Sequence, residues 1–469
     1  MSARVPPRYH EAIDLEALCQ EFPPAPEFFD TVWTLPEEAL RARREAAFLK
    51  QMERAWQVPF YGRRWSAAGL QPGDIRSLDD LKLIPTFSVH DMRESLERDP
   101  FWPDYFGVDP ATDEALPLVF QTSGGTTGLP RPMMFAPRDR EVMNIVTGRR
   151  LFMQGVRPFD RLQVTLSLGL PNGGLLVREG IQKYTGAVPI MTGSGAQTPT
   201  RRQIELMSAW RVTHLIGFPA YLRHMALVAR DELGLDPRSF GIKGLITHLG
   251  VEDRGALEEL WGADVYDTYG MNEFGSVAVD CAEKSGMHVF EDCFAVEVLG
   301  LPEEDGTRRL VAEGEEGSAI VTTFFKHVAP MIRFDTNDIT SFAQGRCACG
   351  STHRRITGIR GRADGMVKLR GVNVFPEAIG ALVAADPRGN GEFLCVLERG
   401  ERMVVRVEAT GADVAADAFA ADLAGRFKEA LSVRLEVEVV PRGTLAPLTG
   451  LDTTSKIRRL IDRRAMQEA

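Results

Sequence analysis

The chain has 469 residues, of which 44% are hydrophobic and 26% are charged, as is usual for a globular protein with more than one core. Its 55 basic and 65 acidic residues give a formal net charge of −10, which argues against a nucleic-acid partner, because such a partner requires a strongly basic surface. The sequence shows no apolar run approaching the ~18 residues of a membrane span and no signal-peptide core near its start, so we expect a cytoplasmic protein without a membrane partner.

The apolar pattern predicts alternating helices and strands over the first two thirds of the chain. Residues 36–56 are helical in pattern, and a short buried run at 115–120 leads into a glycine-rich loop. A strand, a glycine loop and then a helical pattern would suit phosphate capture. Farther along, apolar runs at 162–166 and 188–191 alternate with helical stretches at 200–210 and 221–233. This alternation predicts mostly parallel sheets covered by helices.

The pattern changes after Arg362. Residues 393–397 and 403–407 are predicted to form a hairpin around Arg399-Gly400. A helix should follow, with an apolar face formed by Phe419, Leu423, Phe427 and Leu431, and then a half-buried strand with Leu435, Val437 and Val439. We therefore predict an α/β chain with a large N-terminal domain over 1–362 and a small α+β C-terminal domain over 363–469.

The loop from Ser123 to Arg131 has the composition of a polyphosphate-binding loop. Its glycines can adopt positive φ and leave room for backbone N–H groups around phosphate oxygens, and its hydroxyls add donors. These residues are Ser123, Gly124, Gly125, Thr126, Thr127 and Gly128. The loop is not a Walker A motif, because Leu129-Pro130-Arg131 follows the last glycine. Taken alone, it could also be an ordinary turn.

Four further motifs follow this loop in a fixed order. They are Tyr269-Gly270-Met271-Asn272-Glu273, Arg333-Phe334-Asp335-Thr336-Asn337-Asp338, Gly361-Arg362-Ala363-Asp364 and Thr454-Ser455-Lys456. Together with the loop, they resemble the motifs of the adenylate-forming (acyl–coenzyme A synthetase) superfamily. The chain more narrowly resembles the phenylacetate–coenzyme A ligase branch at Pro59-Phe60-Tyr61, Ala68-Gly69-Leu70, Ser77-Leu78-Asp79-Asp80-Leu81 and Arg370-Gly371-Val372-Asn373-Val374-Phe375-Pro376.

The resemblance implies a two-step ligase for an aryl, arylacetate-like carboxylic acid. The acid and Mg·ATP would give an acyl-adenylate and pyrophosphate, and coenzyme A would then displace AMP. Two rival functions stay open: loading of a carrier protein or another acceptor, and a non-catalytic nucleotide-binding paralogue. The departures at Asn272 and Ser455 from the usual family residues would favour the paralogue. A homodimer is also consistent with the resemblance, although no apolar seam in the sequence demonstrates one.

The resemblance also assigns roles to individual residues. Glu273 would hold Mg²⁺, and Tyr269 would stack on the adenine ring of ATP. Glu252, in Gly250-Val251-Glu252, would also lie beside the adenine. Asp338 would accept hydrogen bonds from the ribose hydroxyls, and Arg362 would support the ribose or a phosphate. Each also has a simpler interpretation as a helix-end carboxylate, a core tyrosine, a turn aspartate or a surface arginine.

The remaining catalytic assignments concern residues that act during the reaction. Lys456 would reach from a mobile C-terminal domain to the carboxylate and the α-phosphate, and Thr126 would act with Lys456 and Glu273 as a catalytic group. Asp364 would be the hinge about which that domain rotates. Without the resemblance, Lys456 is a solvated surface charge and Asp364 a loop aspartate.

Two segments, 167–174 and 217–221, are expected to line the acyl pocket. Their apolar side chains are Leu168, Leu170, Phe218 and Tyr221. These segments contain no obvious cationic residue, which disfavours a dicarboxylate substrate.

Six cysteines are too few for a disulfide scaffold in a chain of this length. Cys347-Ala348-Cys349 precedes a glycine, and Cys281 lies seven residues before His288. These four side chains could form a tetrahedral structural zinc site, in which Cys293 or His353 could replace a member. The other interpretation is that reduced cysteines pack as small hydrophobic residues.

Overall fold

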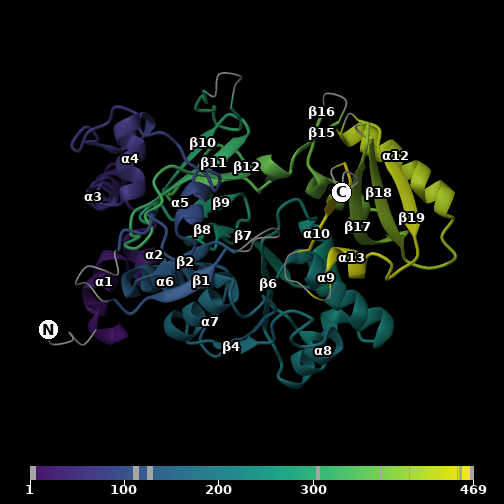
Figure 1. Cartoon of the computed structure of the whole chain (residues 1–469). Coiled ribbons are helices and arrows are strands. Elements are labelled where there is room, and N and C mark those ends of the chain that lie inside the picture. Colours follow the sequence, from purple (N-terminus) through teal and green to yellow (C-terminus); the bar gives the residue numbers. More distant parts are fainter. Residues whose placement is uncertain are drawn as a thin grey trace. The chain divides into compact units, whose positions relative to one another are not determined.

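The computed structural model describes residues 7–108, 116–123, 130–302, 307–369, 372–400, 402–431, 433–451, 453 and 457–464. The chain divides into two compact units (Figure 1). The first contains Met1–Asp160, Leu168–Pro189 and Thr268–Thr357, and the second contains Arg161–Ser167, Ile190–Asp267 and Gly358–Ala469. Among the residues that the structure describes, no helix has the length and apolar character needed to cross a bilayer.

The first unit begins with helices. They are α1 (Leu15–Glu21), α2 (Glu27–Thr31), α3 (Glu37–Ala55), α4 (Pro59–Ala67), α5 (Arg93–Arg98), α6 (Pro137–Met153) and α7 (Asn172–Tyr184). The predicted helix at 36–56 is confirmed as α3, which starts directly after Pro36 with two glutamates in its first turn, where the helix dipole favours negative charge. Its Phe48 and Met52 side chains are buried.

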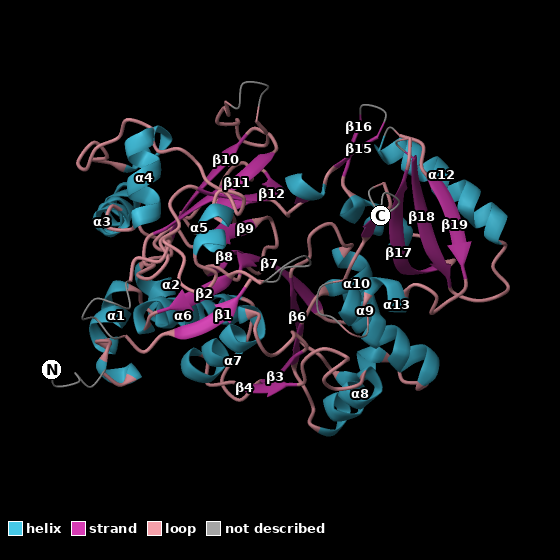
Figure 2. Cartoon of the chain, in the orientation of Figure 1, coloured by secondary structure: helices cyan, strands magenta, loops and turns pink. Residues whose placement is uncertain are grey.

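The strands of the first unit are mostly antiparallel (Figure 2). They are β1 (Val119–Thr122), β2 (Pro132–Phe135), β8 (Gly275–Asp280), β9 (Met287–Val289), β10 (Phe294–Leu299), β11 (Gly317–Thr323), β12 (Phe334–Thr340) and β13 (Arg355–Ile356). One sheet has the order β10-β11-β12, and another has the order β13-β9-β8 next to the second half of β7 (Asp264–Met271).

Helix α6 is buried along most of its length in spite of its many charged residues. The Arg149 guanidinium is 0% exposed, and its Nη1 lies 2.8 Å from Asp292 Oδ2. The Arg140 Nε donates to Glu179 Oε2 on α7 at 2.9 Å. A buried charge requires a partner of this kind, so these pairs fix α6 against its neighbours.

The second unit contains the predicted parallel sheet. Its strands are β3 (Arg161–Val164), β5 (His214–Ile216), β6 (Gly244–Thr247) and the first half of β7, and they pair in the order β7-β6-β5-β3, followed by β4 (Val188–Met191). Helices α8 (Thr200–Ala209), α9 (Pro219–Leu227) and α10 (Arg254–Trp261) contribute to a shared core with these strands. That core includes Met207, Leu222, Leu245, Trp261 and Val265. The prediction of helix-covered parallel strands is therefore confirmed.

The C-terminal part of the second unit has the predicted α+β form. Its elements are β14 (Gly361–Arg362), β15 (Val367–Leu369), β16 (Val372–Val374), α11 (Ile379–Ala384), β17 (Gly389–Glu398), β18 (Arg402–Ala409), α12 (Ala416–Leu431), β19 (Glu436–Val440), α13 (Ala446–Thr449) and β20 (Leu460–Asp462). The sheet has the order β19-β18-β17-β20, and α12 lies beside β19 (Figure 1). The α12 side chains Phe419, Leu423 and Phe427 are buried in the core of this part. The predicted hairpin and helix are confirmed, whereas the domain division between 362 and 363 stays a prediction.

Candidate nucleotide site and cysteine cluster

The glycine-rich loop connects two antiparallel strands. Strands β1 and β2 pair with Thr122 opposite Pro132, and the Ser123 N–H donates to the Arg131 carbonyl at 3.0 Å. The loop is therefore closed at its base, as a phosphate-binding loop requires. Gly124, Gly125, Thr126, Thr127 and Gly128 lie outside the described residues.

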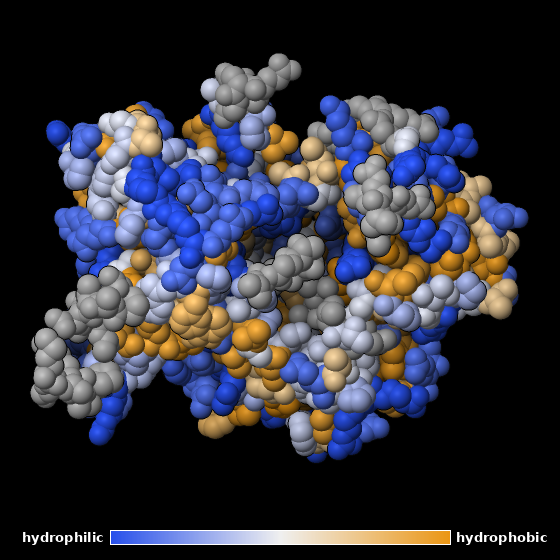
Figure 3. All heavy atoms as spheres, viewed as in Figure 1, coloured by the Kyte–Doolittle hydropathy of each residue, from blue (hydrophilic) through white to orange (hydrophobic). Residues whose placement is uncertain are grey.

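The elements that flank this loop differ from the prediction. A helix was expected directly after the loop, but residues 132–135 form the buried strand β2, and α6 starts at Pro137. Proline at the first helical position fixes this later start. The run at 115–120 was also expected to be buried. Phe120 is instead 38% exposed and stacks on Phe101. Figure 3 shows hydrophobic residues at the surface in the region of β1 and β2.

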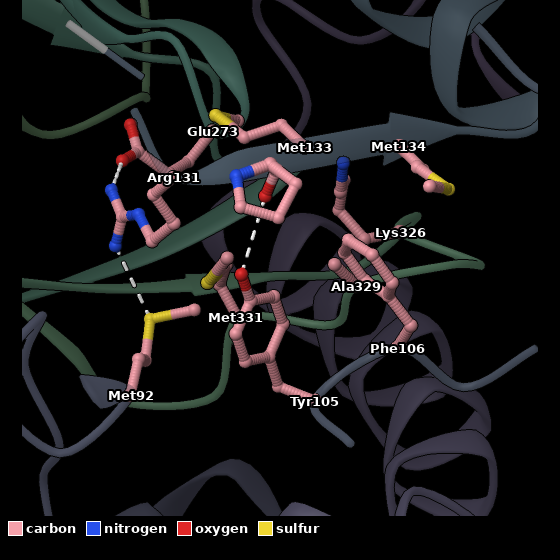
Figure 4. Close-up of a pocket in the computed structure, with 11 residues that line it drawn as sticks. Met92, Tyr105, Phe106, Arg131, Met133, Met134, Glu273, Lys326, Ala329 and Met331 are labelled. Carbon is pink, nitrogen blue, oxygen red and sulfur yellow. Dashed lines mark hydrogen bonds and ion pairs between the residues drawn. The ribbon is translucent and has the colours of Figure 1, made fainter. Parts of the chain in front are cut away.

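The predicted metal ligand Glu273 forms an ion pair with Arg131, the cation at the end of the loop (Figure 4). The Glu273 side chain is 3% exposed, and Arg131 also points a guanidinium nitrogen toward Met92 Sδ at 3.3 Å. Mg²⁺ in nucleotide sites is usually held by one or two carboxylates together with substrate phosphates and water. The buried carboxylate of Glu273, paired with the arginine at the end of the predicted phosphate-binding loop, fits that requirement.

A small cavity lies beside this ion pair and contains a second cation, Lys326 (Figure 4). Its Nζ is 4.0 Å from the centroid of the Phe135 ring, and burial lowers its pKa to about 8. The cavity is lined by Met92, Tyr105, Phe106, Arg131, Pro132, Met133, Met134, Glu273, Lys326, Ala329 and Met331. Lys326 was not predicted from the sequence, although a single cation directly after the mostly apolar run 319–325 was a usable signal.

Tyr269 and Asp338 are brought together by two neighbouring segments of the first unit. Tyr269 lies on β7, Asp338 lies on β12, and the tyrosine hydroxyl donates to Asp338 Oδ2 at 2.9 Å. The two residues are 4% and 8% exposed. Before Asp338, Asn337 adopts a left-handed φ of 61°, which asparagine tolerates. The hydroxyl of Tyr269 thus orients the carboxylate that we predict to bind ribose.

Tyr269→Phe is expected to raise the KM for ATP by roughly 10- to 100-fold, because a hydrogen bond to a charged group contributes about 1.5–3 kcal/mol. Steady-state kinetics over a range of ATP concentrations would measure this change. Tyr9→Phe is a matched control, since it removes a 2.8 Å hydrogen bond to Glu141. An unchanged KM in Tyr269→Phe would mean that the hydroxyl does not orient Asp338 for the nucleotide.

Arg362 and Asp364, in the second unit, form a bidentate ion pair. The Arg362 Nε and Nη2 donate to Asp364 Oδ1 and Oδ2, both at 2.8 Å. Asp364 lies in the short helical turn Ala363–Gly365 between β14 and β15. Glu252 forms an ion pair with Arg223 in the same unit. The hinge role of Asp364 and the nucleotide roles of Arg362 and Glu252 stay predictions.

The four expected acyl-pocket residues fall in different units. Leu168 and Leu170 belong to the first unit, where Leu170 is 56% exposed and its carbonyl accepts the Thr122 N–H at 2.8 Å. Phe218 stacks on His248, and Tyr221 is buried with its hydroxyl 3.0 Å from Gln203 Nε2. Their role in acid recognition stays a prediction.

The cysteine and histidine residues singled out from the sequence form one cluster in the first unit. The ligand atoms of Cys281, His288, Cys347 and Cys349 all lie within 4.8 Å of one another. Burial lowers the pKa of His288 to about 4, so its imidazole is neutral at neutral pH. The two suggested replacements have other neighbours: Cys293 Sγ lies 3.8 Å from Arg149 Nη1, and His353 Nδ1 accepts the Glu291 N–H at 3.1 Å.

Residues 371–464 match the family model of the AMP-binding enzyme C-terminal domain. The chain is 30% identical to the phenylacetate-coenzyme A ligase of Thermus thermophilus over 92% of this chain and 98% of that protein. It is 28% identical to the corresponding ligase of Aromatoleum evansii, over 94% and 98%.

Solved structures give the same relationship. A 2-hydroxyisobutyryl-CoA ligase in the postadenylation state, in complex with 2-HIB-AMP, has a TM-score of 0.81 and 28% identity over 92% of this chain and 91% of that one. An anthranilate CoA ligase in complex with anthranoyl-AMP has a TM-score of 0.53 and 18% identity over 68% and 62%, and therefore supports the fold alone. By its identity to ligases that it matches over nearly their whole length, the chain belongs to the adenylate-forming superfamily, in the phenylacetate–coenzyme A ligase family.

Proposed function

We propose that the protein is an ATP-dependent carboxylate–coenzyme A ligase that acts through an acyl-adenylate. The observation that carries this proposal is the contact between Glu273 and Arg131 at the end of the glycine-rich loop. This ion pair puts the proposed metal ligand next to a cation that would face a bound phosphate. The Tyr269–Asp338 pair adds a candidate ribose acceptor within the same unit.

The first half-reaction requires charge neutralisation more than covalent help from the protein. A carboxylate oxygen attacks the α-phosphorus of ATP, the new C–O–P linkage forms, and the bond to pyrophosphate breaks. Mg²⁺ held by Glu273 would neutralise charge on the phosphate oxygens. Arg131 and Lys326 supply fixed positive charge beside the loop, and Lys456 is proposed to supply a mobile one.

In the second half-reaction, the thiol of coenzyme A attacks the acyl carbon of the adenylate. The thiol loses its proton, a C–S bond forms, and the C–O bond to AMP breaks. Asp364 is proposed as the hinge between the two half-reactions. Its bidentate pair with Arg362 would hold the turn in one conformation until Arg362 engages the nucleotide.

We propose an aromatic, arylacetate-like acid as the substrate. The support is the similarity to two phenylacetate-coenzyme A ligases over nearly the whole chain. A small 2-hydroxy acid is the second candidate, because a 2-hydroxyisobutyryl-CoA ligase is also similar, with a TM-score of 0.81.

Pyrophosphate release with Mg·ATP across a panel of arylacetic, benzoic, 2-hydroxy and aliphatic acids, each with and without coenzyme A, tests this assignment. We expect the highest kcat/KM with an arylacetic acid, and an aryl–coenzyme A and AMP as products. Preference for 2-hydroxyisobutyrate would replace the aromatic assignment by the second candidate. Formation of the adenylate without the thioester would indicate another acceptor. ATP binding without pyrophosphate release from any acid of the panel would favour the non-catalytic paralogue.

A further inference from the structure

Four potential metal ligands converge from two separate segments of the first unit. Cys281 directly follows β8, and His288 lies on β9. Cys347 and Cys349 lie in the loop between β12 and β13. The Sγ atoms of Cys281 and Cys347 are 3.7 Å apart, and Cys349 Sγ is 3.3 Å from His288 Nε2.

These two separations are close to the edges of a zinc coordination tetrahedron, and the other pairs of ligand atoms lie within 4.8 Å of one another. With Zn–S of about 2.3 Å and Zn–N of about 2.0–2.1 Å, tetrahedral angles place two sulfurs about 3.8 Å apart and a sulfur and a nitrogen about 3.5 Å apart. The Cys281–Cys347 distance of 3.7 Å is much longer than a disulfide bond, about 2.05 Å, and the cysteines are free. Packing as small hydrophobic residues gives no reason for all four ligand atoms to face one point.

We propose that Cys281, His288, Cys347 and Cys349 form a closed structural zinc site. Three thiolates and one imidazole complete a tetrahedron and leave no position for a substrate, which is the arrangement of structural rather than catalytic zinc. Thiolate ligands also favour zinc over magnesium or calcium, which prefer oxygen. Cys281, His288 and Cys347 are buried, so the proposed site is largely shielded from water.

Neighbouring groups hold the ligands in this arrangement. The His288 Nδ1 lies 3.3 Å from the His353 carbonyl, which fixes the tautomer that presents the Nε2 lone pair to the cluster. The Ser285 hydroxyl lies 3.4 Å from Cys347 Sγ and accepts a 2.8 Å hydrogen bond from Arg355. The Trp33 ring packs against the His288 ring, with centroids 4.8 Å apart.

The site would link two segments that adjoin the strands of the predicted nucleotide-binding residues Tyr269 and Asp338. β8 pairs with β7 so that Ala278 lies opposite Tyr269, and Cys281 directly follows the end of β8. β12 carries Asp338 and leads into the loop with Cys347 and Cys349. Zinc would therefore cross-link the two segments that continue from β8 and β12. This link would hold Tyr269 and Asp338 at hydrogen-bonding distance. Such a structural role does not depend on which reaction the enzyme catalyses.

Metal analysis of the full-length protein by plasma mass spectrometry tests the proposal without a variant. We expect about one zinc ion per chain that survives gel filtration. Replacement by Co²⁺ should give the intense visible absorption of tetrahedral cobalt with thiolate ligands. The proposal would be overturned if the protein held no more zinc than the buffer after reconstitution, or if it contained iron instead of zinc. A cobalt spectrum without thiolate bands would overturn it as well.

Cys349→Ser tests the ligand set, because Cys349 is the least buried member of the cluster. We expect the variant to lose bound zinc, to melt at a lower temperature than the wild type, and to bind ATP more weakly. Cys19→Ser is the matched control, since Cys19 is also half-buried but lies outside the cluster. Full zinc retention in Cys349→Ser, with an unchanged cobalt spectrum, would contradict the assignment of Cys349.

Discussion

Glu273→Gln is expected to slow pyrophosphate release by roughly 100-fold or more, the loss seen when one charge-stabilising group is removed from a reaction centre. The substitution keeps the shape of the side chain but removes the charge that would bind Mg²⁺. It also leaves the Arg131 guanidinium, of which only 10% is exposed, without its ion-pair partner. The measurement is kcat for pyrophosphate release at saturating ATP and acid, over a range of Mg²⁺ concentrations.

The magnesium dependence separates the metal role from a structural one. If Glu273 binds the metal, the variant should require more Mg²⁺ than the wild type. The loss of the Arg131 ion pair should also lower the melting temperature, so the Mg²⁺ requirement is the measurement that tests the metal role. Glu21→Gln is a matched control, because it removes an ion pair to Arg138 that lies 2.7 Å away. A Glu273→Gln enzyme with the wild-type rate and the wild-type Mg²⁺ requirement would contradict the role of Glu273.

Lys456→Ala is expected to abolish most adenylation, again by roughly 100-fold or more, while ATP binding survives. The resemblance implies that this lysine contacts the carboxylate of the acid and the α-phosphate of ATP. There it would stabilise the negative charge that develops as the new bond forms. Lys456 itself lies outside the described residues. The chain just after it is held in place, because the Arg458 N–H donates to the Thr449 carbonyl at 2.9 Å and Arg459 pairs with Glu392 at 3.0 Å.

Arg458→Ala is the informative control for this prediction. Arg458 is two residues from Lys456. If the family's catalytic lysine position were really that of Arg458, the Arg458→Ala variant, and not Lys456→Ala, would lose adenylation. Pyrophosphate release should fall in Lys456→Ala and stay near the wild-type rate in Arg458→Ala. Unchanged release in Lys456→Ala, or a larger loss in Arg458→Ala, would mean that Lys456 is not the catalytic lysine.

Much of the fold follows from periodicity that a sequence shows directly. α3, β4 and the β17–β18 hairpin were predicted because their apolar residues recur at helical or strand spacing. Helix α6 shows the limit of that argument, since it buries Arg149, and the partner Asp292 is 143 residues away. A pattern within one helix cannot reveal a partner at that separation.

The candidate site was predicted in its parts but not in its contacts. Tyr269, Asp338 and Glu273 were named from motifs, whereas the Arg131–Glu273 ion pair joins residues 142 positions apart. The helix expected after Arg131 is the strand β2 instead, because Pro132 to Phe135 pair with β1 before Pro137 starts α6. The cysteine cluster was predictable because its ligand types are rare in the chain, so few combinations were available.

The most direct test of the account is a single-turnover experiment with the enzyme in excess over an arylacetic acid. With Mg·ATP but no coenzyme A, we predict that acyl-adenylate and pyrophosphate appear in equal amounts on the enzyme. Addition of coenzyme A should then convert the adenylate to acyl–coenzyme A and AMP. Thioester formed together with ADP and phosphate, or no adenylate from any carboxylic acid tested, would contradict the proposal of an AMP-forming ligase.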